Sequence, residues 1–394
     1  MKEIPLCVPN LNTEIIENLR ECIETGWVST SGRFISEFEE KFANYINVKN
    51  AVACQSGTAG LHTALRILGV GSGDEVIVPT LTFIGAVNPV KYVGAYPVFM
   101  DCDDTLCMDA KKLTKFCEEE CDFSNSVLIN KSSGRVIKAI IPVHVFGNLA
   151  DMEALSEIAY RYKIKVIEDA TEALGSFWDA GRYKGRHAGT VGDIGVFSFN
   201  ANKIITTGGG GMIVAKSQNI LDEARYLTST AKDDSLYFVH NEVGYNYRML
   251  NIQAALGVSQ IGELPSFIET KIKNYKLYKS LLGGITGLSL LPFREETKAN
   301  HWFYSLLIGG GADSSNSSAR DYLLNELIKK RIQCRPIWRL IHKQAPYADS
   351  QTYIINNAEF YETRILNLPC STNLKEADIN YICENITDFY QERL

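Results

Sequence analysis

The sequence predicts an α/β protein with a largely parallel sheet and a second, smaller domain. Between residues 50 and 215, short apolar runs alternate with longer segments whose apolar residues recur at helical spacing, as expected where strands and helices follow one another. Several runs are apolar at successive positions, which is typical of strands covered on both faces. The chain has 394 residues, enough for two or three domains of about 100–200 residues each.

Seven apolar runs predict the strands of the first domain in chain order. They are Ala51–Cys54, Glu75–Pro79, Pro97–Met100, Lys138–Val143, Lys165–Ile167, Ile194–Phe199 and Met212–Ala215. Helical spacing is clear in two of the intervening segments, over about 61–68 and 152–159. Helices that connect successive strands favour parallel pairing of those strands.

After residue 215 the pattern changes. Residues 251–283 predict one long helix or two abutting helices, with a kink or break at Pro265 and an end at Gly283-Gly284. Beyond them we expect a strand over 302–308, a polar loop over 309–318, a helix near 320–331 and a final helix near 376–390. The sequence therefore predicts an N-terminal arm and large domain over residues 1–250, and a small α/β domain over residues 251–394.

The composition argues against several classes of protein. Apolar residues make up 45% of the chain and charged residues 22%, which indicates a folded protein with a large core. The net charge of −6 and the absence of a long basic run argue against a nucleic-acid partner. The chain start lacks a signal-peptide pattern, and no apolar run reaches the roughly 18 residues of a membrane span, so we expect a cytoplasmic protein. The ten cysteines form no C-x-x-C pair, and we expect reduced thiols and no metal site.

The first candidate site follows the first predicted strand, at Ser56-Gly57-Thr58. Small residues at a helix N-terminus leave backbone N–H groups unpaired, and the helix dipole favours an anion there. These residues could therefore hold a phosphate. The alternative is that Ser56 and Thr58 are ordinary helix caps.

Two more candidates follow later strands. Asp169 ends the run Lys165–Asp169, and ligands of open α/β sheets bind at the carboxyl ends of strands; the alternative is an aspartate that caps the next helix. Lys203 stands between an apolar strand and the stretch Ile204–Thr207, away from any obvious solvated face. A sheltered lysine loses proton affinity, which is the condition for an amine to form a Schiff base.

Taken together, these three features match the needs of one cofactor. Pyridoxal 5′-phosphate requires a phosphate anchor, a carboxylate beside its pyridinium nitrogen and a lysine that forms an imine with its aldehyde. The phosphate seat, the strand-end aspartate and the sheltered lysine occur in that order along one α/β domain. The sequence therefore predicts a pyridoxal-phosphate enzyme.

At this point the chain resembles a known family, the pyridoxal-phosphate sugar aminotransferases of the DegT/StrS type. The resemblance implies the aspartate-aminotransferase fold (fold type I), with a mixed, mostly parallel sheet, and a homodimer with shared active sites. It extends over nearly the whole chain. The motifs that carry it are Thr25-Gly26-Trp27-Val28-Ser29, Ser56-Gly57-Thr58, Pro79-Thr80-Leu81-Thr82-Phe83, Pro142-Val143-His144-Val145-Phe146-Gly147, Glu168-Asp169-Ala170, Ser198-Phe199, Lys203, and Gly244-Tyr245-Asn246-Tyr247-Arg248-Met249.

The resemblance assigns a role to individual residues. It implies that Lys203 forms the imine, that Asp169 contacts the pyridinium nitrogen and that Phe83 stacks on the ring. The residues that would hold the phosphate are Ser56, Gly57, Thr58 and Ser198, with Asn246 contributed by the other subunit. For Asn246 the alternative is that it only caps a turn.

The chain departs from the family pattern at two places. Many relatives carry Gln three residues after the aspartate, where it bonds the cofactor's phenolic oxygen; here the residue is Glu172, a carboxyl that needs a shared proton or another geometry. At the second place, relatives often carry Thr-Thr-Gly-Glu-Gly-Gly after the lysine, where this chain has Thr206-Thr207-Gly208-Gly209-Gly210-Gly211. That stretch, with Gly185-Arg186-His187 and Arg335-Pro336-Ile337-Trp338-Arg339, resembles the branch that acts on UDP-linked, N-acetylated 4-keto-6-deoxy sugars, in the legionaminic-acid and bacillosamine pathways.

The expected reaction is transfer of an amino group from L-glutamate to C4 of a nucleotide-linked 4-keto-6-deoxyhexose, for polysaccharide or glycan biosynthesis. The cofactor would alternate between pyridoxal and pyridoxamine phosphate. Weaker candidates for contact with the substrate are Arg248, His301, Trp302, Trp338 and His342, although small-domain aromatic residues are more often core. The alternatives are a sugar dehydratase on the same fold, in which His typically replaces Lys203, and a non-catalytic regulatory protein.

Overall fold

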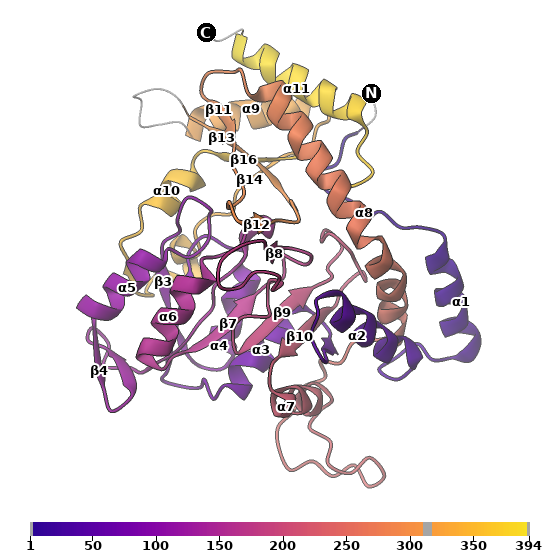
Figure 1. Ribbon diagram of the computed structural model, residues 1–394, viewed down its shortest axis with the longest axis vertical. Helices are drawn as coiled ribbons and strands as arrows, with labels where there is room; N and C mark the ends of the chain where they lie inside the picture. The colour runs from indigo at the N-terminus through magenta and orange to yellow at the C-terminus, as the bar shows by residue number, and fades with distance from the viewer. Residues whose placement is uncertain (1–2, 310–316, 392–394) are drawn as a thin grey trace.

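The chain folds around an eight-stranded sheet, which confirms the predicted fold class. A computed structural model describes residues 3–309 and 317–391 (Figure 1). The strand order is β1-β10-β9-β7-β6-β2-β3-β15, and only β10 runs against the others. The strands are β1 (Val52–Cys54), β2 (Glu75–Pro79), β3 (Tyr96–Met100), β6 (Ile137–Ile140), β7 (Lys165–Asp169), β9 (Ile194–Ser198), β10 (Gly211–Ala215) and β15 (Thr352–Tyr353).

All seven strands predicted for the first domain are present, because each apolar run is buried in this sheet. The helices around it are α3 (Gly57–Ile67), α4 (Asn88–Tyr92), α5 (Ala110–Glu119), α6 (Met152–Tyr162) and α7 (Gln218–Thr228). Helix α3 packs against β9 and β10, so its N-terminus lies at the carboxyl ends of the parallel strands. Two N-terminal helices, α1 (Glu14–Thr25) and α2 (Arg33–Tyr45), were not predicted.

Helix α8 (Asn251–Leu282) is continuous, which is the first of the two predicted alternatives, and it is not broken at Pro265. An interior proline removes one backbone hydrogen bond and strains the preceding turn, but this helix packs against α1, α2 and α11 along its length. The burial of Ile261, Leu264 and Phe267 on both sides of Pro265 offsets that cost. Figure 1 shows α8 running from the large sheet to the small domain. Among the described helices, none is long and apolar enough to cross a bilayer.

The small domain contains a four-stranded antiparallel sheet of order β11-β13-β16-β14. Its strands are β11 (Leu288–Leu290), β13 (Tyr304–Ile308), β14 (Arg335–Pro336) and β16 (Ile365–Leu368), and its helices are α9 (Ser317–Lys329), α10 (Asn357–Glu362) and α11 (Glu376–Gln391). The predicted strand and both predicted helices are therefore present. Most of the loop predicted over 309–318 lies outside the described residues.

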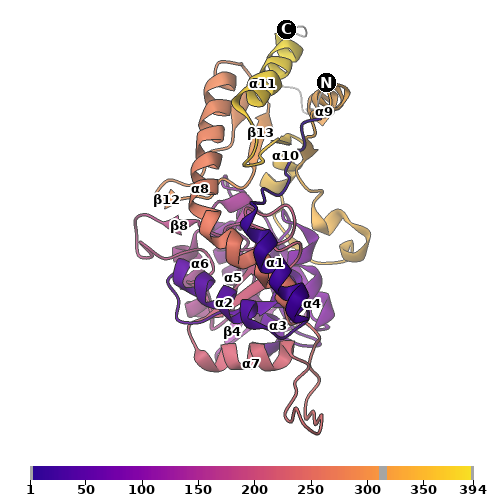
Figure 2. The same cartoon turned by 90° about the vertical axis from the view of Figure 1, so that its right-hand side faces the viewer.

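Several contacts tie the two predicted domains together. The N-terminal arm pairs with the small domain, where the Ile4 N–H donates to Arg331 O at 2.9 Å, and β15 returns to the large sheet beside β3. The two-stranded antiparallel sheet of β8 (Phe177–Trp178) and β12 (Thr297–Lys298) makes a further link. The chain crosses between the large sheet and the small domain more than once (Figure 2). The predicted domain boundary near residue 250 therefore stays a prediction.

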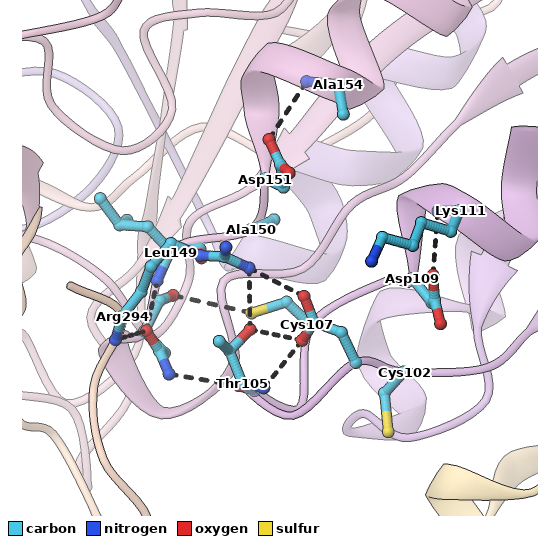
Figure 3. Close-up of polar contacts among 12 residues, drawn as sticks. Cys102, Thr105, Cys107, Asp109, Lys111, Leu149, Ala150, Asp151, Ala154 and Arg294 are labelled. Carbon is cyan, nitrogen blue, oxygen red and sulfur yellow. Dashed lines mark hydrogen bonds and ion pairs between the residues drawn. The ribbon is translucent and has the colours of Figure 1, made fainter. Parts of the chain in front are cut away.

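Arg294 makes a further link through several hydrogen bonds (Figure 3). Its guanidinium donates to Asp103 Oδ2 at 2.8 Å and to the Leu149 carbonyl at 2.9 Å, and its backbone N–H donates to Asn148 Oδ1 at 2.9 Å. A planar guanidinium with several fixed acceptors holds its partners in one orientation. The segment between β11 and β13 is thus held against the loops that follow β3 and β6.

Candidate active site

A cavity of about 610 Å³ opens at the carboxyl ends of the parallel strands, between the large sheet and the small domain. Strands β1, β2, β7 and β9 run in the same direction, so the loops that follow them meet at this edge. The predicted residues that line the cavity are Ser56, Gly57, Thr58, Phe83, Asp169, Glu172, Ser198, Lys203, Trp302 and Trp338.

The N-terminus of α3 faces this cavity. Ser56 is the N-cap, since its Oγ accepts the Ala59 N–H at 3.1 Å, as the capping alternative proposed. Its side chain leaves the N–H groups of Gly57 and Thr58 at the start of the helix, where an anion is favoured. A Cβ at Gly57 would lie 2.7 Å from Thr171 Cγ2, so only glycine allows the backbone this close to the neighbouring loop. Ser198 ends β9 beside these residues.

Asp169 lies at the end of β7 with 2% of its surface exposed. Its Oδ1 accepts the Thr171 N–H at 3.0 Å, and residues 170–176 form turns, so Asp169 does not cap a helix. Burial raises the pKa of its carboxyl, while the hydrogen bonds from Thr171 and the nearby Lys203 and His144 act in the opposite direction. A carboxylate held this way can stabilise a cation at the cavity wall.

A buried pair that was not predicted from the sequence lies next to Asp169. His144 and Glu168 are both fully buried, and His144 Nε2 lies 3.0 Å from Glu168 Oε2. His144 Nδ1 accepts the Ala150 N–H at 3.1 Å, which makes Nε2 the donor to Glu168. Glu168 also accepts the N–H of Gly189 at 2.9 Å. The pair holds the end of β7, which carries Asp169, against the segment that follows β6. Its sequence signal was His144, which stands in a motif with no role assigned to it.

Lys203 follows β9, and 13% of its side chain is exposed. Its Nζ lies 3.9 Å from Glu172 Oε1 and 3.9 Å from the centre of the Trp302 ring. Burial lowers the pKa of the Lys203 amine, and the carboxyls of Glu172 and Asp169 oppose that shift. Trp302 is itself fixed, since its Nε1 donates to Asn202 O at 2.7 Å. The arrangement gives a sheltered amine between two carboxyls and an aromatic face.

Glu172 is almost fully buried beside Lys203. Its Oε2 accepts the Phe146 N–H at 2.8 Å. Burial raises the pKa of the Glu172 carboxyl to about 7, against the opposing effects of Lys203 and the Phe146 N–H. Phe146 has φ 55°, a left-handed conformation that is costly for a non-glycine residue, and its ring lies 4.6 Å from that of Trp338.

Four predicted residues do not line this cavity. Asn246 pairs with Ser229, and Arg248 Nε donates to Thr30 O at 3.0 Å. His301 packs between Tyr275 and Phe293, with ring centres at 4.8 and 3.9 Å, and burial lowers its pKa to about 3. His342 Nδ1 lies 2.6 Å from Thr80 Oγ1. His301 is therefore half-buried against aromatic side chains of the small domain and does not reach the cavity.

Other lining residues were not singled out from the sequence. They include Leu6, Thr82, Thr171, Asn200, Asn202, Arg335 and Asn367. Among the residues that line the cavity, Arg335 and Lys203 carry the cationic side chains. Arg335 had a sequence signal, because it opens the motif that contains Trp338. Leu6 and Asn367 come from the arm and from β16, and only the tertiary fold brings them here.

Comparison with known proteins identifies the family. The model of the DegT/DnrJ/EryC1/StrS aminotransferase family matches residues 9–387. The chain belongs to this family. Among its relatives, GDP-perosamine synthase from Escherichia coli O157:H7 is 36% identical over all of both chains, and GDP-perosamine synthase from Caulobacter vibrioides is 37% identical over 97% of both. Among solved structures, the aminotransferase TlmJ from Streptoalloteichus hindustanus is 26% identical, with a TM-score of 0.88 over all of both chains.

As a member of the DegT/DnrJ/EryC1/StrS family, the protein is a pyridoxal-phosphate-dependent aminotransferase. Its cavity fits that cofactor chemically. The start of α3 offers unpaired N–H groups for a phosphate, Asp169 offers a buried carboxylate, and Lys203 offers a sheltered amine. Phe83 presents an aromatic side chain that is 56% exposed although it lines a cavity, and a planar ring could cover it.

Proposed function

We propose that the enzyme transfers the amino group of L-glutamate to the C4 ketone of a nucleotide-linked 4-keto-6-deoxyhexose. The observation that carries the proposal is the convergence of Lys203, Asp169 and the start of α3 on one cavity. Family membership supports the aminotransferase chemistry. The two GDP-perosamine synthases that are similar to this chain over nearly its whole length support a nucleotide sugar as the acceptor.

In this proposal, the chain's own residues hold the cofactor and move protons. The N–H groups of Gly57 and Thr58 and the hydroxyls of Thr58 and Ser198 bind the phosphate. Asp169 would hold a proton on the ring nitrogen, and Phe83 would pack on the ring face. When bound, pyridoxal phosphate would supply the electron sink that amino transfer needs. Lys203 would hold the cofactor through its amine and, once released, would carry a proton as a base and an acid.

The substrate end of the cavity is formed by the small domain. Arg335, Trp338 and Asn367 line it. An exposed arginine there suits the phosphates of a nucleotide sugar, since a guanidinium binds phosphate oxygens in pairs. The UDP-linked, N-acetylated sugar expected from the sequence stays a prediction. The names of the two relatives make a GDP-linked sugar the competing choice.

We further propose a homodimer in which Asn246 completes the partner's phosphate site. The loop between α7 and α8 projects from the lower end of the large domain (Figure 2). It exposes large apolar side chains, with Leu236 73%, Tyr237 76% and Val243 76% exposed. Several exposed apolar side chains on a projecting segment indicate a surface that binds another protein. We propose that the binding partner is a second copy of this chain. Asn246 stands at the base of this loop and does not line its own chain's cavity.

The direct test is product analysis with the holoenzyme. The enzyme is incubated with glutamate and, separately, with GDP-, UDP- and dTDP-linked 4-keto-6-deoxy sugars, and products are identified by mass spectrometry. We expect an amino sugar from one of these acceptors, and no product without glutamate. A dehydrated sugar would support the dehydratase alternative, and unchanged acceptors throughout the panel would contradict the proposed substrate class.

A further inference from the structure

Glu172 is a buried carboxyl in the cavity to which the proposed reaction gives no task. Its two oxygens have different surroundings. Oε2 is fixed by the Phe146 N–H at 2.8 Å. Oε1 faces the amine of Lys203 at 3.9 Å, and among the described residues no hydrogen bond to it is present. One oxygen is therefore anchored, while the other is free to exchange a proton with the amine.

The surrounding backbone holds Glu172 in this position. Asn300 Nδ2 donates to the carbonyl oxygens of Glu172 at 3.0 Å and of Leu174 at 2.9 Å. Gly147 packs so closely on Asn300 that a Cβ would lie 1.8 Å from Asn300 Oδ1. Phe146, which supplies the anchoring N–H, is kept in its left-handed conformation by this contact and by the packing of its ring on Trp338. Strained residues persist where the surrounding structure over-determines them.

Two charged side chains act on Glu172, and two histidines lie on neighbouring segments. Lys203 approaches from the loop after β9 and favours the carboxylate, while Asp169 at the end of β7 disfavours it. His144, from the turn that also carries Phe146, is bonded to Glu168 and faces Asp169. His301, from the segment of Asn300, packs against Tyr275 and Phe293. Lys203 is thus the partner with which Glu172 can share a proton.

We propose that Glu172 holds the proton that Lys203 gives up and takes back. In one direction the O–H bond at Oε1 breaks and an N–H bond forms at Nζ, so that a neutral acid and a neutral amine become a carboxylate and an ammonium; the reverse step restores both. Glu172 acts through Lys203 and is a positioning residue for its proton. The catalytic meaning of this exchange rests on the proposed function, but the exchange itself is a property of the protein alone.

The test measures how readily Lys203 reacts as a function of pH. Cofactor-free protein is trace-labelled with a small acylating reagent, and the labelling of each lysine is quantified by peptide mass spectrometry. Replacing the carboxyl by an amide removes the group that stabilises the ammonium, so in Glu172→Gln we expect the labelling midpoint of Lys203 to fall by about one pH unit or more. Glu157→Gln, on the exposed side of α6, is the matched control, and the exposed Lys49 is the internal reference. An unchanged Lys203 midpoint in Glu172→Gln overturns the proposal.

A second variant and a spectrum complete the test. Glu172→Asp keeps a carboxyl group but shortens the side chain by one methylene, which moves the carboxyl away from Lys203. The labelling midpoint of Lys203 in this variant should fall between those of the wild type and Glu172→Gln. A midpoint below that of Glu172→Gln contradicts the proposal. In the holoenzyme, the pH at which the cofactor absorbance changes should shift in Glu172→Gln and not in Glu157→Gln. If borohydride attaches the cofactor to another lysine while the midpoint shift persists, the proposed function fails and proton sharing stands. If the adduct is on Lys203 and the Lys203 midpoint does not shift in Glu172→Gln, the proposed function stands and proton sharing fails.

Discussion

The two sides of the cavity differ in how their residues arrive there. On the large-domain side, Ser56, Asp169, Ser198 and Lys203 lie at or just beyond the carboxyl ends of strands of one sheet. On the small-domain side, Arg335 and Asn367 come from short strands of a second sheet, and His301 packs against aromatic side chains instead. Sheet topology alone gathers the first set, whereas the second depends on how two bodies pack.

The difference extends to how the polar groups are held. On the large-domain side each buried carboxyl has a fixed partner, such as the Thr171 N–H for Asp169 and the Phe146 N–H for Glu172. The small-domain side offers the exposed guanidinium of Arg335 and the half-buried ring of Trp338, which packs against Phe146. A preorganised side suits a cofactor that stays bound through the reaction, and a more open side suits a substrate that enters and leaves.

The largest expected effect comes from the centre of the large-domain side. Lys203→Ala removes the amine, and Lys203→Arg replaces it with a group that stays protonated and forms no imine. We expect both variants to fold and to lose transamination by about 10⁴-fold or more, measured as amino-sugar formation, while Lys49→Ala stays active. Borohydride should attach the cofactor to Lys203 in the wild type, and an adduct on a different lysine would refute the assignment.

A smaller effect is expected at the carboxyl that faces the ring nitrogen. Asp169→Asn keeps the shape and the hydrogen bond from Thr171 but cannot stabilise a pyridinium charge. We expect the variant to bind cofactor and to lose at least tenfold in turnover, which corresponds to about 1.4 kcal/mol in the barrier. Asp222→Asn, on the exposed side of α7, serves as the control. Turnover within tenfold of the wild type would remove Asp169 from the proposed role.

The same contrast explains how much could be predicted from the sequence. The strands and the residues at their ends follow from local apolar runs, so Asp169 and Lys203 were found before the fold was known. Helix α2 was missed although Phe34, Phe38 and Phe42 recur at helical spacing and are buried, so its signal was present. In contrast, the two-residue strand β15, the conformation of Phe146 and the contacts of Asn300 arise from tertiary packing, and no local pattern encodes them.

The burial of Glu172 should be visible in the stability of the cofactor-free protein. Its pKa is raised to about 7 in the folded protein from about 4.3 when unfolded. The folded state therefore binds this proton more tightly, and the stability it contributes is present at low pH and lost as pH rises from about 4 to 7. An amide does not titrate, so from pH 5 to pH 8 Glu172→Gln should gain up to about 3 kcal/mol relative to the wild type. Urea unfolding at the two pH values checks this, and equal pH dependence in the two proteins would contradict it.

The final prediction concerns Asn246, which does not line the cavity of its own chain. The expected effect is a factor of about two in the number of active sites. If Asn246 reaches the partner's phosphate, then Asn246→Asp places a carboxylate against a dianion and weakens cofactor binding in the other subunit's site, while Lys203→Ala disables the site of its own chain. In a dimer that contains one subunit of each kind, one site carries both defects and the other carries neither. Mixing two poorly active enzymes should therefore restore activity to one of the two sites in each mixed dimer, measured as amino-sugar formation after subunit exchange has been verified by native mass spectrometry. A mixture of Asp222→Asn with Lys203→Ala provides the control for exchange alone. If the first mixture stays as inactive as its parents, Asn246 acts within its own chain, as the turn-capping alternative holds, and the cavity of a single chain must contain the whole phosphate site.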